Sequence, residues 1–282
     1  MNRVLTIARL TVLEASRRKL LLALAGLTLL VIVLTSWGFS RLPTMKDVTP
    51  AEVRLAASQL TILVAFMFSG VLALGSTLVA APAIASDIES GIALAILPRP
   101  IRRSEVLMGK WLGLTILIAI YAAASGVLEM LGIWLATRYL PPNPAATIVY
   151  VAAEGVVLMS LALLLSTRLA PMTGGVVALV LFFVGWIGGI ALAIGQVFNN
   201  DTIINIGVGS RLLIPTDGLW HGAIYYLEPS DILAAARAAG RARAGNPFYA
   251  DSPLPLSYIL WVVAWLVAVL GVANWSFGRR DL

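Results

Sequence analysis

Long apolar runs separated by short polar stretches dominate the pattern of this chain. A bilayer core of about 30 Å requires roughly 20 apolar residues in a helix. Six runs reach this length, at about 20–39, 60–83, 109–136, 146–167, 173–197 and 256–277. The pattern predicts an all-α membrane protein with six transmembrane helices, and residues 1–282 are expected to form a single transmembrane domain.

Two stretches outside these runs have features of their own. Residues 1–19 place an apolar stripe beside a basic face, which predicts a helix lying in the membrane interface. An ordinary cytoplasmic lead-in is the alternative. Residues 198–255 form an outer segment between the fifth and sixth runs. In it, Ser230 or Asp231 can cap a helix, whose arginines are interpreted as a solvated face, with recognition of an anionic ligand or headgroup as the alternative.

The fifth run is rich in glycine. Gly185 and Gly189 lie four residues apart in it, and this spacing allows a second helix to approach closely.

Composition supports membrane insertion and excludes several kinds of site. Only 12% of the residues are charged, whereas soluble domains carry about 25%. The absence of cysteine excludes disulfides and thiolate metal sites. With a single histidine, His221, one chain cannot form a bis-histidine haem or a His-cluster metal site. No metal site is therefore expected. The net charge of +6 is interpreted as membrane orientation, and no nucleic-acid partner is expected.

The basic residues are distributed unevenly between the two sides of the membrane. Six spans put both termini on one side, which carries 12 of the 20 basic residues although its loops are shorter. Cytoplasmic loops carry the excess of Lys and Arg. Both termini, and the polar stretch from Asp87 to Lys110, are therefore predicted to be cytoplasmic in a multi-pass membrane protein.

The stretch from Asp87 to Lys110, here called the charged island, is the densest polar feature between two spans. Ser86 and Asp87 are expected to cap a short helix through about Leu97, which Pro98 and Pro100 then end. A short helix lying across the ends of two membrane helices can transmit a push from a docked partner.

Catalytic motifs are missing from the sequence. Gly109-Lys110 is followed by Trp111, so it is not part of a GxxxxGK[ST] phosphate loop. HExxH and GxSxG are also absent. The chain is therefore not expected to be an enzyme, and any ATP hydrolysis must come from another subunit.

The charged island resembles the cytoplasmic loop between spans two and three in permease subunits of ABC-2 type (type V exporter-like) ABC transporters. It departs from that pattern at Ile92 and Leu94, where the family often has Thr and Glu. The likeness extends along the chain to the interfacial helix, the six spans and the stretch Leu212 to Gly222. The matching positions in the island are Glu89, Gly91, Leu97, Pro100, Arg103, Glu105, Leu107, Gly109 and Lys110.

The resemblance implies the permease subunit of an ATP-driven exporter in a prokaryotic inner membrane. Two copies, expected to be a homodimer, would pair with two separate ATPase subunits that hold ATP and Mg, and this chain would carry no cofactor. The island would supply a short cytoplasmic coupling helix. The residues implied in ATPase coupling are Asp87, Glu89, Gly91, Leu97, Arg99, Arg103, Glu105 and Lys110.

Glu129 and Glu154 fall inside the third and fourth spans. An ionised group there costs at least a few kcal/mol, so it usually faces a cavity or a partner. One interpretation is a translocation path or cation site lined by these glutamates with Ser125 and Tyr150. The other is a protonated glutamate bonded between helices, or one that snorkels outward. Two rival functions also stay open: a proton-coupled secondary transporter using these glutamates, and a membrane assembly factor that transports nothing.

Overall fold

The structure of the chain, a computed structural model, describes residues 3–17, 19–44, 48–91, 102–230, 233–234 and 246–280. Nearly all of these residues are helical, which confirms the predicted all-α class. In chain order the elements are α1 (Arg3–Ser16), α2 (Lys19–Arg41), the 3-10 turn η1 (Leu42–Thr44), α3 (Pro50–Ala80), α4 (Pro82–Glu89), α6 (Arg103–Thr137), α7 (Pro144–Ser166), α8 (Pro171–Phe198), α9 (Asp201–Leu213), α10 (Thr216–Leu227) and α13 (Leu256–Gly278).

Six helical segments among the described residues are long and apolar enough to cross a membrane, which confirms the six predicted spans. They are Lys19–Thr44, Pro50–Glu89, Arg103–Thr137, Pro144–Ser166, Pro171–Phe198 and Leu256–Gly278.

Some helices start well before the apolar run that each contains. α3 begins at Pro50 because Thr49 and Glu52 form a capping box, in which Thr49 N donates to Glu52 Oε2 at 2.8 Å and Glu52 N donates to Thr49 Oγ1 at 3.3 Å. Likewise, Asn143 Oδ1 accepts from Ala146 N at the start of α7. Caps of this kind extend a helix beyond its hydrophobic stretch.

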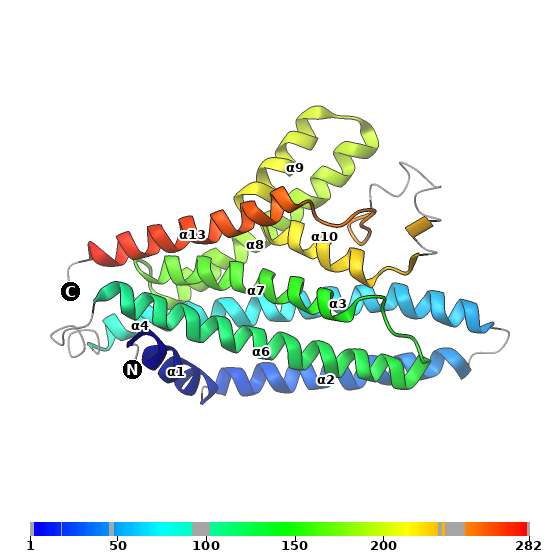
Figure 1. Cartoon of the computed structure of the whole chain (residues 1–282), viewed down its shortest axis with the longest axis horizontal. Coiled ribbons are helices and arrows are strands. Elements are labelled where there is room, and N and C mark those ends of the chain that lie inside the picture. The colour runs from blue at the N-terminus through cyan, green and yellow to red at the C-terminus, as the bar shows by residue number, and fades with distance from the viewer. Residues whose placement is uncertain are drawn as a thin grey trace.

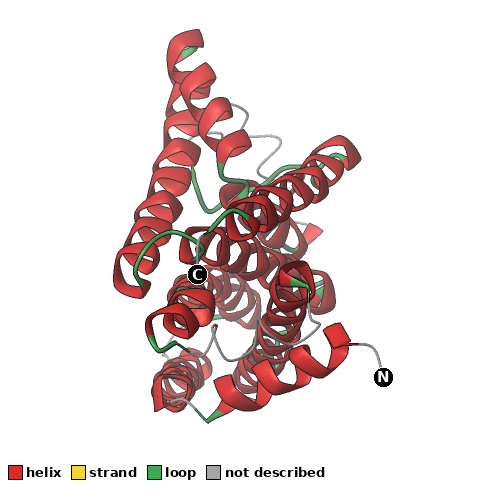
Figure 2. Ribbon diagram, turned by 90° about the vertical axis from the view of Figure 1, so that its left-hand side faces the viewer, coloured by secondary structure: helices red, strands yellow, loops and turns green. Residues whose placement is uncertain are grey.

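The long helices run antiparallel and form a bundle, seen from the side in Figure 1 and turned by 90° in Figure 2. The first and last helices, α1 and α13, meet the same end of the bundle, where α4 and the start of α6 also lie (Figure 1). We call it the termini end. α8 leaves the bundle at an angle, and α9 folds back along it as a hairpin. α10 then returns to pack on α7.

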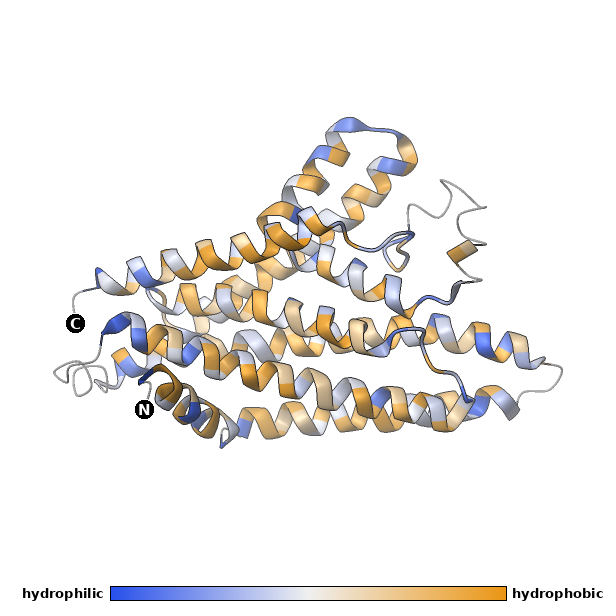
Figure 3. Cartoon of the chain, in the orientation of Figure 1, coloured by the Kyte–Doolittle hydropathy of each residue, from blue (hydrophilic) through white to orange (hydrophobic). Residues whose placement is uncertain are grey.

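The bundle is built around α3 and α7. Half of the most apolar window of each is buried, against 11% for α2 and α13. Hydrophobic residues cover the sides of the bundle, and hydrophilic residues gather near its ends and at the tip of the hairpin (Figure 3). The outward apolar faces of α2 and α13 are therefore placed to face lipid.

α1 packs directly against α6 at two glycines. A Cβ on Gly109 would lie 2.6 Å from Ile7 Cβ, and a Cβ on Gly113 would lie 2.6 Å from the carbonyl oxygen of Ala8. Glycines four residues apart on one helix let a second backbone approach closely. The opposite side of α1 exposes leucines such as Leu5 and Leu10, as expected for a helix in the membrane interface.

Glycine also closes the α8–α9 hairpin. A Cβ on Gly195 would lie 2.8 Å from Ile204 N, and one on Gly207 would lie 2.6 Å from Leu192 N. Gly185 and Gly189, whose spacing allows a close approach, lie against the segment that opens α10. A Cβ on Gly189 would collide with the carboxylate of Asp217.

The outer segment contains two helices that the sequence did not predict, α9 and α10. The helix predicted after Ser230 lies outside the described residues except for Leu233 and Ala234, which are helical.

We predict that Gly113→Ala destabilises the chain by roughly 1–3 kcal/mol, because an added methyl overpacks the α1–α6 contact. Gly271→Ala is the matched control, since nothing lies within 4 Å of a Cβ at that position, and alanine has the higher helix propensity. The measurement is thermal unfolding in detergent. Equal melting temperatures for the two variants would contradict close packing of α1 against α6 at Gly113.

Candidate functional site

The charged island begins within a helix that starts earlier than predicted. α4 runs from Pro82 to Glu89, and Ser86 Oγ donates to the Pro82 carbonyl inside it. The predicted capping role of Ser86 and Asp87 is therefore wrong. The reason is that Ala81 keeps a helical backbone and Pro82 is well placed in a first turn, so the chain resumes a helix immediately. Leu97 and Arg99 lie outside the described residues.

Asp87 ties α4 to α6 through Lys110. Lys110 is 8% exposed, and its ammonium group donates to the Asp87 carboxylate and to the Ala83 carbonyl. The last turn of α4 exposes Glu89, and Gly91 follows with φ of +74°. In this conformation glycine carries no Cβ penalty. α4 therefore ends within one turn of a partly buried ion pair.

Arg103 connects the start of α6 to the end of α13. Its Nη1 donates to the carbonyls of Phe277 at 3.0 Å, Gly278 at 3.2 Å and Arg280 at 2.7 Å. The last carbonyls of a helix have no partner within that helix, and a cation is stabilised there by the helix dipole. Arg103 therefore caps α13 from a neighbouring helix.

Glu105 fixes the first turn of α6. Its Oε2 accepts from the backbone N–H of Arg102 at 2.8 Å and lies 3.6 Å from Nη1 of Arg3 in α1. Four residues predicted for ATPase coupling (Asp87, Arg103, Glu105 and Lys110) are thus bound within the bundle, whereas Glu89 is exposed to solvent.

A second set of bonds at the same end was not anticipated from the sequence. Arg168, after α7, donates through Nε to Ser276 Oγ at 2.9 Å and through Nη2 to the Ser276 carbonyl at 3.0 Å. In return, Arg280 Nη1 donates to the Thr167 carbonyl at 2.6 Å. α6, α7 and α13 are therefore linked at the termini end by arginines. The sequence feature that could have indicated these bonds is the basic residue that follows each helix, Arg168 after α7 and Arg280 after α13.

The intramembrane glutamates each bind a hydroxyl on another helix. Thr35 Oγ1 of α2 donates to Glu129 at 2.9 Å, and Ser69 Oγ of α3 donates to Glu154 at 2.8 Å. Both glutamates are buried. Tyr150 stacks on Tyr226, with 5.7 Å between ring centroids. The two carboxyl groups therefore have separate partners.

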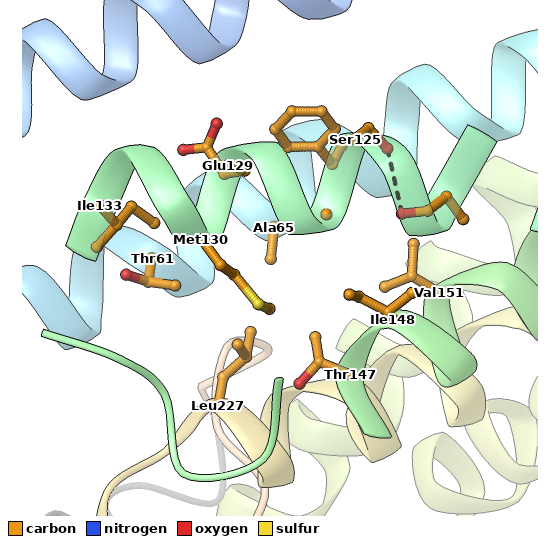
Figure 4. Close-up of a pocket in the computed structure, with 13 residues that line it drawn as sticks. Thr61, Ala65, Ser125, Glu129, Met130, Ile133, Thr147, Ile148, Val151 and Leu227 are labelled. Carbon is orange, nitrogen blue, oxygen red and sulfur yellow. Dashed lines mark hydrogen bonds between the residues drawn. The ribbon is translucent and has the colours of Figure 1, made fainter. Parts of the chain in front are cut away.

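Glu129 and Ser125 share the wall of a cavity of about 50 Å³, which is lined by residues of α3, α6, α7 and α10. In Figure 4 the carboxyl group of Glu129 is turned away from the middle of this cavity, which Met130 and Ile148 approach. Ser125 Oγ donates to the Tyr121 carbonyl in its own helix. Glu154 and Tyr150 do not line this cavity. The structure thus brings together two of the four residues predicted for a path.

These features define a multi-pass membrane protein whose helices are joined at the termini end by hydrogen bonds and ion pairs of charged side chains. Residues 5–282 match the family model described as ABC-2 family transporter protein. The chain belongs to this family, and it is an ABC-2 type permease. Membership makes the chain a membrane transport component, with an ABC ATPase subunit as partner. No curated protein sequence matches the chain at a significant level.

We predict that Glu129→Gln and Glu154→Gln leave thermal stability and the ATPase activity of the assembled complex unchanged, because glutamine retains an oxygen that accepts from Thr35 or Ser69. Leucine at either position removes that acceptor and should destabilise the chain by roughly 1 kcal/mol, as interhelical polar contacts in membranes do. Melting temperature and ATPase rate are the measurements.

Thr35→Val and Ser69→Ala are matched controls, since each deletes the donor of the same pair. If both glutamine variants fold normally but lose ATPase activity, the glutamates act through their charge and belong to the path.

Proposed function

We propose that the chain is the permease subunit of an ATP-driven exporter, and that the ATPase docks on the charged island at the termini end. The observation that carries this proposal is the anchoring of the island on both sides. Asp87 at the start of the island is bound to Lys110 at its end, and Arg103, also in the island, is bound to the end of α13. A push on the island would reach α4, α6 and α13 together.

The distribution of charge supports a cytoplasmic position for this end. Arg3, Arg103, Arg168 and Arg280 all take part in its contacts, and cytoplasmic segments carry an excess of basic residues. The chain would lie in a prokaryotic inner membrane with both termini in the cytoplasm. Two copies would pair with two ATPase subunits, which would bind ATP and Mg and supply the hydrolysis. The island would then act as the coupling element.

The rival function, proton-coupled transport through Glu129 and Glu154, has less support. A proton relay needs groups that exchange a proton in sequence. The two carboxyl groups are bonded instead to Thr35 and Ser69 on different helices, and only Glu129 lines the cavity between the helices.

We predict that Glu89→Arg lowers the amount of ATPase that co-purifies with the tagged permease by about tenfold, the effect of losing roughly 1.4 kcal/mol of binding energy. Glu89 is exposed at the end of α4, so the permease itself should fold normally. Asp201→Arg is the matched control, because Asp201 is also exposed but opens α9 at the hairpin tip. Undiminished co-purification with Glu89→Arg would exclude docking at this end of α4.

We predict that Arg103→Gln keeps the ATPase bound but uncouples α13 from α6. The chain has no cysteine, so spin labels attach only to cysteines that are introduced. We choose Met108→Cys in α6 and Val272→Cys in α13, because both positions are exposed. In the otherwise unchanged chain their distance should stay constant when the complex is trapped with ATP and vanadate. In Arg103→Gln the distance distribution should broaden.

If the distance between these labels already changes in the chain with Arg103 intact, α6 and α13 do not move as one unit. That result would contradict the proposed transmission through Arg103 and leave docking at Glu89 to be judged by co-purification.

A further inference from the structure

A polar cavity of about 230 Å³ lies on the half of the molecule away from the termini end. It is bounded by the last turns of α8, the end of α9, α10 and residues 246–255. Since a water molecule occupies about 30 Å³ in the liquid, the space corresponds to roughly eight waters. Its polar lining residues include Gln196, Arg211, His221, Asn246, Asp251 and Ser252.

Arg211 is held in this cavity by a buried ion pair. Asp217 Oδ2 accepts from Arg211 Nε at 2.8 Å and lies 2.6 Å from Nη2, and the Asp217 side chain is only 2% exposed. Arg211 lines the cavity and Asp217 does not, so the guanidinium group stands between the carboxylate and the open space. A buried ion pair is costly to form, and this one fixes a planar donor group at the wall of a cavity.

His221 stands beside Arg211 because it follows Asp217 by one helical turn. Its Nδ1 lies 2.9 Å from the Asp217 carbonyl oxygen and 3.2 Å from Nη2 of Arg211. Burial lowers the pKa of His221 below its ordinary value, so the ring is neutral at pH 7. The guanidinium of Arg211 is therefore the positive group on this wall, and the imidazole contributes a polar ring without adding charge.

The position of the cavity relative to the membrane is indicated by the start of α13. Pro253, Leu254 and Pro255 line the cavity immediately before α13 begins at Leu256. Tyr258, in the first turn of α13, donates its OH to the Arg211 carbonyl at 3.1 Å. Tyr and Trp concentrate where a membrane helix crosses the headgroup region. The cavity thus lies at the level of lipid headgroups.

We propose that this cavity binds a phosphate group that carries an amino or hydroxyl substituent, the chemistry of a phospholipid headgroup. The guanidinium of Arg211 matches the oxygens of a phosphate, and His221 stands beside it. Asp251 and the amides of Gln196 and Asn246 line the same space and can accept hydrogen bonds from the substituent. Hydrogen bonds from the substituent to these groups would favour the substituted phosphate over an unsubstituted one. The proposal is independent of ATPase docking.

Native mass spectrometry of the delipidated full chain in detergent can test this proposal. The probes are short-chain phosphatidylethanolamine, glycerophosphoethanolamine, inorganic phosphate and diacylglycerol. We expect phosphatidylethanolamine to bind, and inorganic phosphate and diacylglycerol to bind at least about tenfold more weakly. Glycerophosphoethanolamine distinguishes the source of the ligand: if it binds as tightly as the lipid, the site takes a soluble phosphoester, and if it binds more weakly, the site takes the lipid headgroup.

Variants decide whether Arg211 makes the contact. Arg211→Lys keeps the ion pair but loses the planar fork, and it should weaken binding about tenfold. The double variant Arg211→Gln with Asp217→Asn removes both charges without leaving a lone buried carboxylate, and it should abolish binding while melting near the temperature of the unchanged chain. Arg138→Lys is the matched control, because Arg138 stacks on Trp134 at the end of α6.

Equal binding of phosphatidylethanolamine by the unchanged chain, Arg211→Lys and the folded double variant would overturn the proposal. Binding of inorganic phosphate as tight as that of the lipid would overturn the part assigned to the substituent.

Discussion

The hydrocarbon interior of a membrane leaves every polar group to find its partner within the protein, and the arrangement of this bundle follows from that constraint. Within a helix, the backbone N–H and C=O groups form hydrogen bonds with one another. Polar side chains in the spans then bond across helices, and each such pair fixes the register of two neighbours. These pairs include Thr35–Glu129 and Thr28–Tyr121 between α2 and α6, Ser69–Glu154 between α3 and α7, and Trp111–Ser160 between α6 and α7.

The same constraint gives the two regions of the molecule different chemistry. At the termini end, Arg103, Arg168 and Arg280 satisfy carbonyls at the ends of neighbouring helices, so that helices far apart in sequence are joined at their tips. Away from it, the charged pair Arg211–Asp217 lies at the junction of α9 and α10, where the chain turns between two short helices. Charge at the first region resists relative movement of helices. At the second region, the charged side chain of Arg211 lines an open cavity.

The sequence predicts the spans well, because hydrophobic length is a local property. It does not predict that α4 begins at Pro82, because a proline can either end a helix or start the next, and only the backbone of Ala81 decides. The role of Arg103 as a cap of α13 could not be predicted from the sequence either. Its partners lie more than 170 residues along the chain, and a cap supplied by another helix leaves no local pattern. The candidate path was predicted because Glu129 and Glu154 lie inside the spans, but the sequence does not determine the direction in which the two side chains point.

Glycine explains how an outer segment that looks irregular in sequence acquires a defined structure. Gly195 and Gly207 let α8 and α9 pack with their backbones in contact, and Gly189 leaves room for the Asp217 carboxylate. A larger residue at Gly189 would displace that carboxylate, and Arg211 would lose the partner that orients it. The glycine-rich face of α8 therefore does more than allow two helices to approach. It sets the position of a buried charge, and through it the position of the guanidinium group that faces the cavity.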